Sequence, residues 1–262
     1  MPTWIDSHNH LQDPRLGDPG PVIAAMKQTG VVRCVVNATR ESDWASVETF
    51  ATDEPDFISP AFGIHPWQAH TAASGWQQRL AGILDKHPRA SIGECGLDQW
   101  VAEPALEIQR AVFIDQIWIA REKDRPITVH CLKAWSALFD CFAETPPPSR
   151  FLMHSFGGSI ETARRLIPLG AYFSVSGYFR HPRKSAMLET FRKLPQDRIL
   201  LETDAPDMLP PPEIITHPLP ENQNHPANLP AIGRALAAAL GMTSDDFASL
   251  TRHNARQCFG LF

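Results

Sequence analysis

The sequence predicts a closed α/β barrel in which eight parallel strands alternate with helices. Short apolar or β-branched runs alternate with amphipathic stretches along the whole chain. The 262-residue length suits a single (β/α)₈ TIM barrel, because α/β barrels of about 250 residues form one domain. We therefore assign residues 1–262 to one domain. An open doubly wound sheet is the alternative, but the sequence contains neither GxGxxG nor GxxxxGK[ST], the nucleotide loops that such a sheet would require.

The predicted strands are short runs rich in apolar and β-branched residues. They lie at 4–8, 31–37, 57–64, 90–94, 127–130, 151–154, 171–175 and 199–202. Helical patterns fill the intervening stretches, at 20–29, 41–52, 75–86, 103–124, 133–143, 159–168 and 184–193, with a final pair near 227–240 and 243–256. Each crossover is long enough for a helix, so neighbouring strands are expected to run parallel.

Two segments stand out for their composition. The stretch 103–124 has the clearest helical period, with apolar residues at Leu106, Ile108, Val112, Phe113, Ile117 and Ile119. Eight of the 24 prolines fall between residues 206 and 230, after the last strand. Because proline stiffens a loop, we expect one long ordered loop at the carboxyl edge of the barrel. It is either a rigid connector or a wall of the site.

Composition excludes several classes of protein. Hydrophobic residues at 43% and charged residues at 20% are typical of globular proteins and not of disordered ones. The net charge of −5 argues against a broad electrostatic grip on nucleic acid but allows a local phosphate site. Five cysteines without a CxxC pair indicate reduced thiols. With no apolar stretch of about 20 residues and no signal peptide, we expect a cytoplasmic protein that does not bind membranes.

The sharpest local pattern is the pair His8 and His10 at the end of the first predicted strand. Residues i and i+2 of a strand project to the same face about 6.6 Å apart, so two imidazoles can converge on one metal ion. Two exposed histidines in a turn would have the same pattern. The pair by itself therefore does not distinguish a metal site from a turn.

Four further strands also end in a strong ligand type, namely Glu94, His130, His154 and Asp204. A single such residue at a strand end is usually a cap or a surface residue. All the carboxyl ends of a barrel meet at one mouth, however, which favours one common site. Four histidines and two carboxylates suit Zn²⁺, Mn²⁺, Fe²⁺ or Ni²⁺ better than Ca²⁺. Six ligands exceed the four of one structural zinc and fit two ions that share a carboxylate and generate hydroxide.

The residue types also suggest roles within this set. Glu94 is the candidate bridge, because a carboxylate has two oxygens whereas a neutral imidazole offers a metal one nitrogen. Asp204 can bind a metal and also accept the proton of the attacking water. Asp6, just before the two histidines, either orients one of them or caps the turn.

These residues lie in a series of motifs. They are Asp6-Ser7-His8-Asn9-His10, Gly63-Ile64-His65-Pro66, Gly93-Glu94-Cys95-Gly96-Leu97-Asp98, Pro126-Ile127-Thr128-Val129-His130, His154-Ser155-Phe156-Gly157-Gly158 and Leu201-Glu202-Thr203-Asp204-Ala205-Pro206. In content and order the series resembles the TatD family of metal-dependent hydrolases. The resemblance implies a TIM barrel of the amidohydrolase superfamily with a dinuclear site and deoxyribonuclease activity, often a 3′ to 5′ exonuclease. It implies that His8, His10, Glu94 and Asp204 hold one ion, and that Glu94, His130 and His154 hold the other.

Substrate-binding residues are predicted less sharply. The resemblance puts His65 near the substrate, where it would act in catalysis by donating to a phosphate oxygen, or else it fixes its loop. Lys133 stands where family members often have a basic pair, although an ammonium cannot copy the bidentate guanidinium fork. Asn224, before His225 and Pro226, resembles the family's Asn-x-Pro segment. The tryptophans after strand ends, Trp67, Trp100 and Trp135, either stack nucleobases or pack under loops.

The sequence therefore predicts a hydrolase that uses two divalent ions to cleave phosphodiesters, with DNA or a small phosphodiester as its substrate. The ions are expected to be zinc, manganese, magnesium, iron or nickel. A hydrolase of a small ester, amide or aminoacyl ester on the same site is the alternative within enzymes, and the net charge and Lys133 favour it slightly. A metal-binding scaffold without turnover is the alternative outside enzymes. No obligate protein partner is implied.

Overall fold

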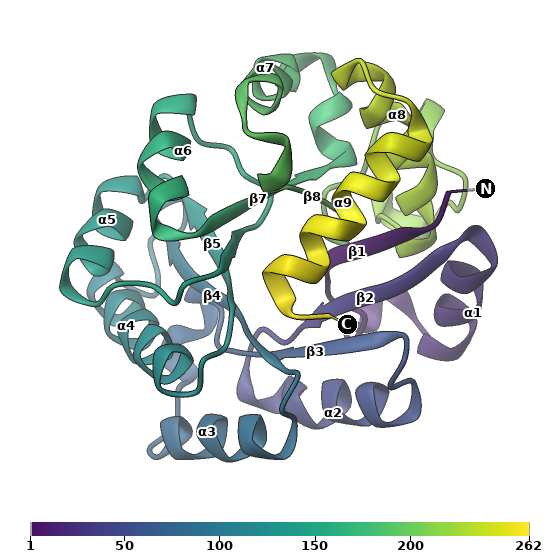
Figure 1. The fold of residues 1–262 in the computed structure, drawn as a ribbon. Helices are drawn as coiled ribbons and strands as arrows, with labels where there is room; N and C mark the ends of the chain where they lie inside the picture. The colour runs from purple at the N-terminus through teal and green to yellow at the C-terminus, as the bar shows by residue number, and fades with distance from the viewer. Residues whose placement is uncertain (1, 262) are drawn as a thin grey trace.

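The computed structural model describes residues 2–261 and consists of a ring of eight parallel strands surrounded by helices (Figure 1). The strands follow one another around the ring in chain order from β1 to β8. Their bounds are β1 Trp4–Asn9, β2 Val31–Asn37, β3 Ile58–Phe62, β4 Ser91–Asp98, β5 Ile127–Leu132, β6 Phe151–Met153, β7 Ala171–Ser176 and β8 Ile199–Glu202. The predicted (β/α)₈ TIM barrel is confirmed.

Helices α1 to α7 pack on the outside of the ring and connect successive strands, and helices α8 and α9 follow the last strand (Figure 1). Their bounds are α1 Pro19–Thr29, α2 Trp44–Asp53, α3 Trp76–Lys86, α4 Leu106–Glu122, α5 Trp135–Glu144, α6 Ile160–Leu166, α7 Ser185–Lys193, α8 Leu229–Leu240 and α9 Ser244–Phe259. Local sequence explains their ends. Helix α1, for example, starts after the capping side chain of Asp18 with Pro19 in its first turn, and it stops at Gly30, which has a left-handed backbone.

Several predicted bounds were wrong. Strand β4 does not stop at Glu94 but continues to Asp98, and β5 continues to Leu132, because the two strands stay paired through Asp98 and Leu132. Glu94 and His130 therefore lie within strands and not at their ends. Helix α4 begins at Leu106 and not at residue 103.

Close backbone contact between β4 and β5 depends on Gly96. Its φ is +136°, and a Cβ at this position would overlap the carbonyl oxygen of His130. Only glycine adopts this backbone conformation readily and allows such an approach. Gly96 thus determines how close His130 lies to the strand that carries Glu94.

The ring closes between β8 and β1 beside the carboxyl ends of these strands. There the N–H of Asp204 donates to the carbonyl of His8 at 3.0 Å, and the N–H of His10 donates to the carbonyl of Ala205 at 2.8 Å. The buried carboxylate of Asp6 crosses the same junction and accepts from the N–H and hydroxyl of Thr203, at 2.9 and 2.6 Å. Barrel closure therefore brings residues separated by nearly 200 positions into register.

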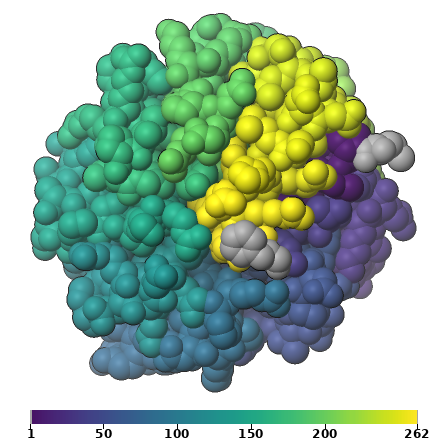
Figure 2. Space-filling view, viewed as in Figure 1, coloured from purple at the N-terminus to yellow at the C-terminus, as the bar shows by residue number. Residues whose placement is uncertain are grey.

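Helix α9 covers the other end of the barrel. Its last turns bury Ala255, Cys258 and Phe259 against inward-facing strand residues such as Ile5 and Tyr172. Figure 1 shows α9 crossing this face, and Figure 2 shows the C-terminal segment covering its centre in the same view. Within residues 2–261, no helix has the length and apolar character needed to cross a bilayer.

Candidate metal centre

The structure brings all six predicted ligand residues together at the carboxyl ends of the strands. They come from β1, β4 and β5 and from the residues just after β1, β6 and β8, and all are largely buried. The group consists of His8, His10, Glu94, His130, His154 and Asp204. Three overlapping trios from this region have their potential ligand atoms within 4.8 Å of one another, and one of these trios includes His65.

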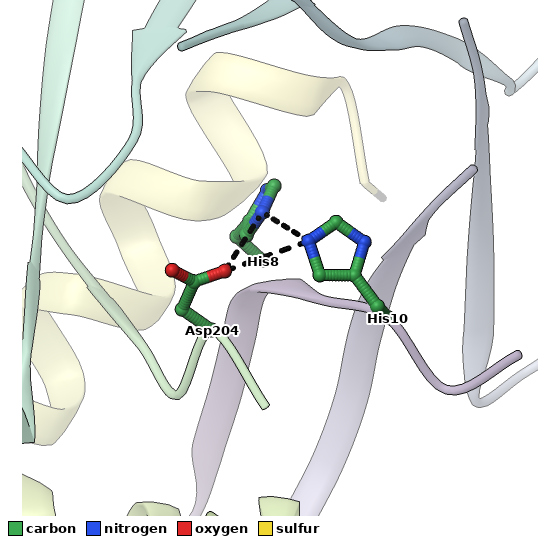
Figure 3. Close-up of side chains that lie close together, drawn as sticks. All are labelled: His8, His10 and Asp204. Atoms are coloured by element: carbon green, nitrogen blue, oxygen red, sulfur yellow. Dashed lines mark hydrogen bonds and ion pairs between the residues drawn. The ribbon is translucent and has the colours of Figure 1, made fainter. Parts of the chain in front are cut away.

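The first set of atoms surrounds one point between β1 and the end of β8 (Figure 3). His8 Nε2 lies 3.2 Å from His10 Nε2, 3.2 Å from Asp204 Oδ1 and 3.3 Å from Glu94 Oε2. His10 Nε2 lies 3.2 Å from Glu94 Oε2 and 3.5 Å from Asp204 Oδ1. In a tetrahedral site with bonds of about 2.0–2.1 Å, neighbouring ligand atoms lie about 3.3–3.4 Å apart. The spacing therefore fits a divalent cation held by these four residues.

Hydrogen bonding on the far side of His10 supports this fit. Its Nδ1 lies 2.8 Å from the backbone carbonyl of Asn37, which can only accept, so Nδ1 carries a proton. In the neutral ring Nε2 then presents a lone pair toward two carboxylates that are themselves acceptors. Such a buried convergence of acceptors needs a cation or additional protons to be stable.

The second set of atoms surrounds the other oxygen of Glu94. Its Oε1 lies 2.7 Å from His154 Nε2, 3.0 Å from His130 Nδ1 and 3.3 Å from His65 Nε2. His130 Nδ1 and His154 Nε2 are 3.0 Å apart. Glu94 thus directs one oxygen to each set of histidines, which is the geometry of a carboxylate that bridges two ions.

His65 differs from the other histidines because its second nitrogen already accepts a hydrogen bond. The backbone N–H of Trp67 donates to His65 Nδ1 at 3.2 Å, so the neutral ring carries its hydrogen on Nε2. That N–H points toward Glu94 Oε1. Burial lowers the pKa of His65 to about 4, although Glu94 acts in the opposite direction. His65 is therefore a neutral hydrogen-bond donor in the site and not a nitrogen ligand.

Two carboxylates that sequence reasoning did not select support the ligands from behind. Asp98 accepts from His130 Nε2 at 3.0 Å, which leaves Nδ1 of that ring free to bind metal. Glu202 is fully buried and accepts a hydrogen bond from the backbone N–H of Ser155, the residue that follows His154. Asp98 belongs to the quoted Gly93–Asp98 motif. Glu94 and Asp98 are four positions apart on a strand and so share a face, which is the signal that would have found it.

Asp6 contacts no ligand side chain. Its carboxylate accepts from the backbone N–H of His8 at 3.3 Å and from Thr203, so of its two predicted roles the structure supports capping the turn. Burial raises the pKa of Asp6 to about 6, against the effect of these hydrogen bonds.

The histidines and carboxylates shift one another's protonation. Burial opposes the charged form of His8, but Glu94 and Asp204 outweigh it and raise its pKa to about 9. Burial likewise opposes protonation of His130, while Asp98 and Glu94 raise its pKa to about 9. Burial opposes ionisation of Asp204, yet hydrogen bonds from His10 and His8 hold its pKa well below its usual value. Protons and metal ions therefore compete for the same nitrogens.

A cavity of about 330 Å³ opens above the cluster. Its lining includes His10, His65, Glu94, His130, His154 and Asp204. The size lies within the range of small-molecule sites, about 300–1,000 Å³. From the proline-rich segment only the stretch just after β8 reaches the lining, through Asp207 and Met208. The rest of that segment is a connector, with short helical turns such as Pro212–Ile214 and Pro226–Asn228.

Two of the three predicted substrate-binding residues lie outside the lining. Asn224 is fully buried, and its side-chain amide donates to the carbonyl of Thr203 at 2.9 Å, so it secures the loop, and its binding of substrate stays a prediction. Lys133 places its Nζ 3.9 Å from the ring centre of Trp100, outside the cavity. Of the three tryptophans only Trp67 lines the cavity, since Trp135 packs edge-on against Phe156. His65, by contrast, lies in the cavity wall.

A parallel barrel with a buried cluster of histidines and carboxylates at the carboxyl ends of its strands defines the class of metal-dependent barrel enzymes. Comparisons with known proteins identify the family. A family model for TatD related DNases matches residues 5–260. The chain therefore belongs to the TatD family of metal-dependent hydrolases.

Individual relatives agree with this assignment. The chain is 32% identical to the uncharacterized metal-dependent hydrolase YabD of Bacillus subtilis (strain 168), over 98% of this chain and 99% of that protein. It is 30% identical to the 3'-5' ssDNA/RNA exonuclease TatD of Edwardsiella piscicida, over 94% of this chain and 94% of that protein. The crystal structure of YjjV, a TatD homologue from Escherichia coli K12, covers 98% of each chain with a TM-score of 0.88 and 27% identity.

Proposed function

We propose that this protein is a phosphodiesterase that uses two divalent metal ions and degrades single-stranded DNA from the 3′ end. The observation that carries the two-ion site is the position of Glu94, whose Oε2 faces His8 and His10 while its Oε1 faces His130 and His154. The substrate class is supported by the relatives at about 30% identity that are named 3'-5' ssDNA/RNA exonucleases.

The residues divide the work of such a reaction. His8, His10, Glu94 and Asp204 would hold one ion, and Glu94, His130 and His154 the other. When bound, divalent ions supply Lewis acidity that makes water a nucleophile at neutral pH and offsets charge on phosphoryl oxygens. Asp204 lines the cavity with an ionised carboxylate and accepts the proton of the attacking water. His65 donates its Nε2–H to a phosphoryl oxygen as negative charge develops there.

A second function, hydrolysis of a small carboxyl ester or amide, is favoured by the charge of the rim, which is the part of the cavity wall that carries Arg15 and Arg40. Both arginines that line the cavity are already paired with carboxylates: Arg15 with Asp13 and Asp207, and Arg40 with Asp43. The rim therefore offers a polyanion little uncompensated positive charge. A neutral ester would not need any.

The two functions separate in one set of assays. Purified protein loaded with Mn²⁺ or Zn²⁺ is given single-stranded DNA with a free or a blocked 3′ end, bis-p-nitrophenyl phosphate, and a panel of carboxyl esters. We expect phosphodiester cleavage that a blocked 3′ end suppresses. Turnover of esters without phosphodiester cleavage would establish the second function, and metal binding without any turnover would indicate a scaffold.

Two substitutions test the roles of the carboxylates. We expect Asp204→Asn to lower kcat by about 10²- to 10⁴-fold, the usual loss when a positioned proton acceptor is removed. Glu94→Gln should lower both kcat and the number of bound ions, measured by metal analysis. Glu189→Gln, which changes an exposed carboxylate outside the cavity, is the matched control. Full activity in Asp204→Asn would contradict the assigned mechanism.

A further inference from the structure

Trp67 stands at the mouth of the cavity as a rigid, exposed aromatic surface. It follows His65 and Pro66 after β3 and remains 47% exposed while lining the cavity. Its backbone N–H is engaged by His65 Nδ1, and its indole N–H donates to Asp98 Oδ2 at 2.7 Å. The ring also meets the His65 imidazole edge-on, with centroids 5.1 Å apart. With both N–H groups satisfied within the protein, the side chain offers a ligand the apolar face of the indole.

The position of the ring is linked directly to the metal-binding histidines. The same oxygen of Asp98 that accepts from Trp67 also accepts from His130 Nε2 at 3.0 Å. The Nε2 of His65, whose ring meets the indole edge-on, lies 3.3 Å from Glu94 Oε1. These contacts hold the indole in a fixed position relative to the candidate ligands His130 and Glu94, as a substrate-orienting surface requires.

Because the arginines of the rim are paired with carboxylates, an aromatic contact contributes more to nucleic-acid binding here than it would on a basic surface. Non-specific nucleic-acid binding normally depends on free Lys and Arg side chains that contact phosphates. Here Arg15 is shared by two carboxylates at 2.8 and 2.9 Å, and Arg40 is paired with Asp43 at 3.1 Å. The cavity wall can instead hold a single strand by stacking, which accepts any base.

We propose that Trp67 is a nucleobase subsite: the base next to the phosphodiester that is cleaved stacks on the exposed face of this indole. The inference rests on the proposed nuclease function and adds to it the group that the site recognises. It is also consistent with the paired arginines of the rim, because a base recognised by stacking needs no free arginine.

The chain supplies a matched control in Trp100. This residue is 65% exposed, and its backbone N–H contacts the same Asp98 carboxylate at 2.6 Å, but its ring lies beneath Lys133 and outside the cavity. Removing Trp100 thus deletes an exposed indole of equal size at a place where the substrate base is not expected.

A double-mutant cycle between protein and substrate tests the subsite. Wild type, Trp67→Ala, Trp67→Phe and Trp100→Ala are loaded with Mn²⁺ and assayed on an oligonucleotide and on the same oligonucleotide with abasic residues at its 3′ end. Stacking is worth about 1–3 kcal/mol per base, so Trp67→Ala should raise KM for the normal strand roughly 5- to 150-fold. On the abasic strand Trp67→Ala and wild type should have similar KM values.

The other variants complete the test. Trp67→Phe keeps an aromatic face and should recover most of the affinity, while Trp100→Ala should resemble wild type on both strands. An equal effect of Trp67→Ala on both strands, or no effect on either, would overturn the subsite while leaving the nuclease function intact. Failure of the wild type to cleave either strand, together with hydrolysis of carboxyl esters, would overturn the proposed function instead.

Discussion

At the scale of single residues, the partner of one imidazole nitrogen decides what the other nitrogen can do. A carbonyl acceptor at Nδ1 of His10 and a carboxylate acceptor at Nε2 of His130 turn the remaining nitrogens into candidate ligands. His65 has a donor, the N–H of Trp67, at the corresponding place, and its remaining nitrogen becomes a donor. His65 therefore differs in function from His10 and His130 because of the partner at its second ring nitrogen.

A histidine that is not among the candidate ligands, His225, has a predicted pH dependence. His225 Nδ1 accepts the N–H of Ala227 at 3.0 Å, and burial together with His217 lowers the pKa of His225 to about 4. The unfolded chain takes up this proton near pH 6.5, whereas the folded chain does not until about pH 4. The contribution of His225 to stability is therefore complete above pH 6.5 and is lost as the pH falls from there toward 4.

His225→Asn keeps an acceptor for the Ala227 N–H and removes the titration. We expect its melting temperature to fall less steeply than that of the wild type between pH 6.5 and 4.5, as followed by circular dichroism. Other histidines titrate in both proteins, so the difference between the two curves isolates His225. Parallel curves would contradict the prediction.

At the scale of one element, β4 organises the site. Glu94, Gly96 and Asp98 alternate along it and share a face: Glu94 contacts both sets of histidines, Gly96 admits the backbone of His130, and Asp98 orients the imidazole of His130. A strand that ended at Glu94, as predicted, would lack the last two of these contacts.

Gly96→Ala should therefore damage both the fold and the site. The added methyl group overlaps the carbonyl of His130 and requires a backbone conformation that alanine disfavours. We expect a loss of at least about 2 kcal/mol in the free energy of unfolding, measured with urea, and weaker metal binding. Gly82→Ala is the control: it lies within α3 with nothing near its Cβ, and should stabilise by about 0.5–1 kcal/mol. Equal stability of the two variants would show that the β4–β5 contact is not tight.

At the scale of the whole molecule, the candidate ligands come from strands spread around the barrel, including β1 and the residues after β8 at the closing junction. Bound ions would thus connect elements that are far apart in the sequence. Anything that binds only the folded state stabilises it by mass action.

We therefore expect a chelator to lower the melting temperature, and Mn²⁺ or Zn²⁺ to restore it. With free metal at about 100 times Kd the gain is about 2.7 kcal/mol, or roughly 5–11 °C for a protein of this size, by differential scanning calorimetry. His8→Ala with Glu94→Gln should no longer respond to metal. A melting temperature that is independent of metal in the wild type would contradict a site built from these strands.

The sequence by itself determined the barrel, the number and order of its strands and the set of ligand residue types. Alternation of apolar runs with amphipathic stretches is a local property of the chain, and the carboxyl ends of parallel strands must share one edge. Only the tertiary structure decided that each oxygen of Glu94 faces a different set of histidines, that Asn224 secures a loop, and that Trp67 alone among the tryptophans after strand ends reaches the cavity. Those features depend on hydrogen bonds and packing between segments far apart in the chain, which no local pattern records.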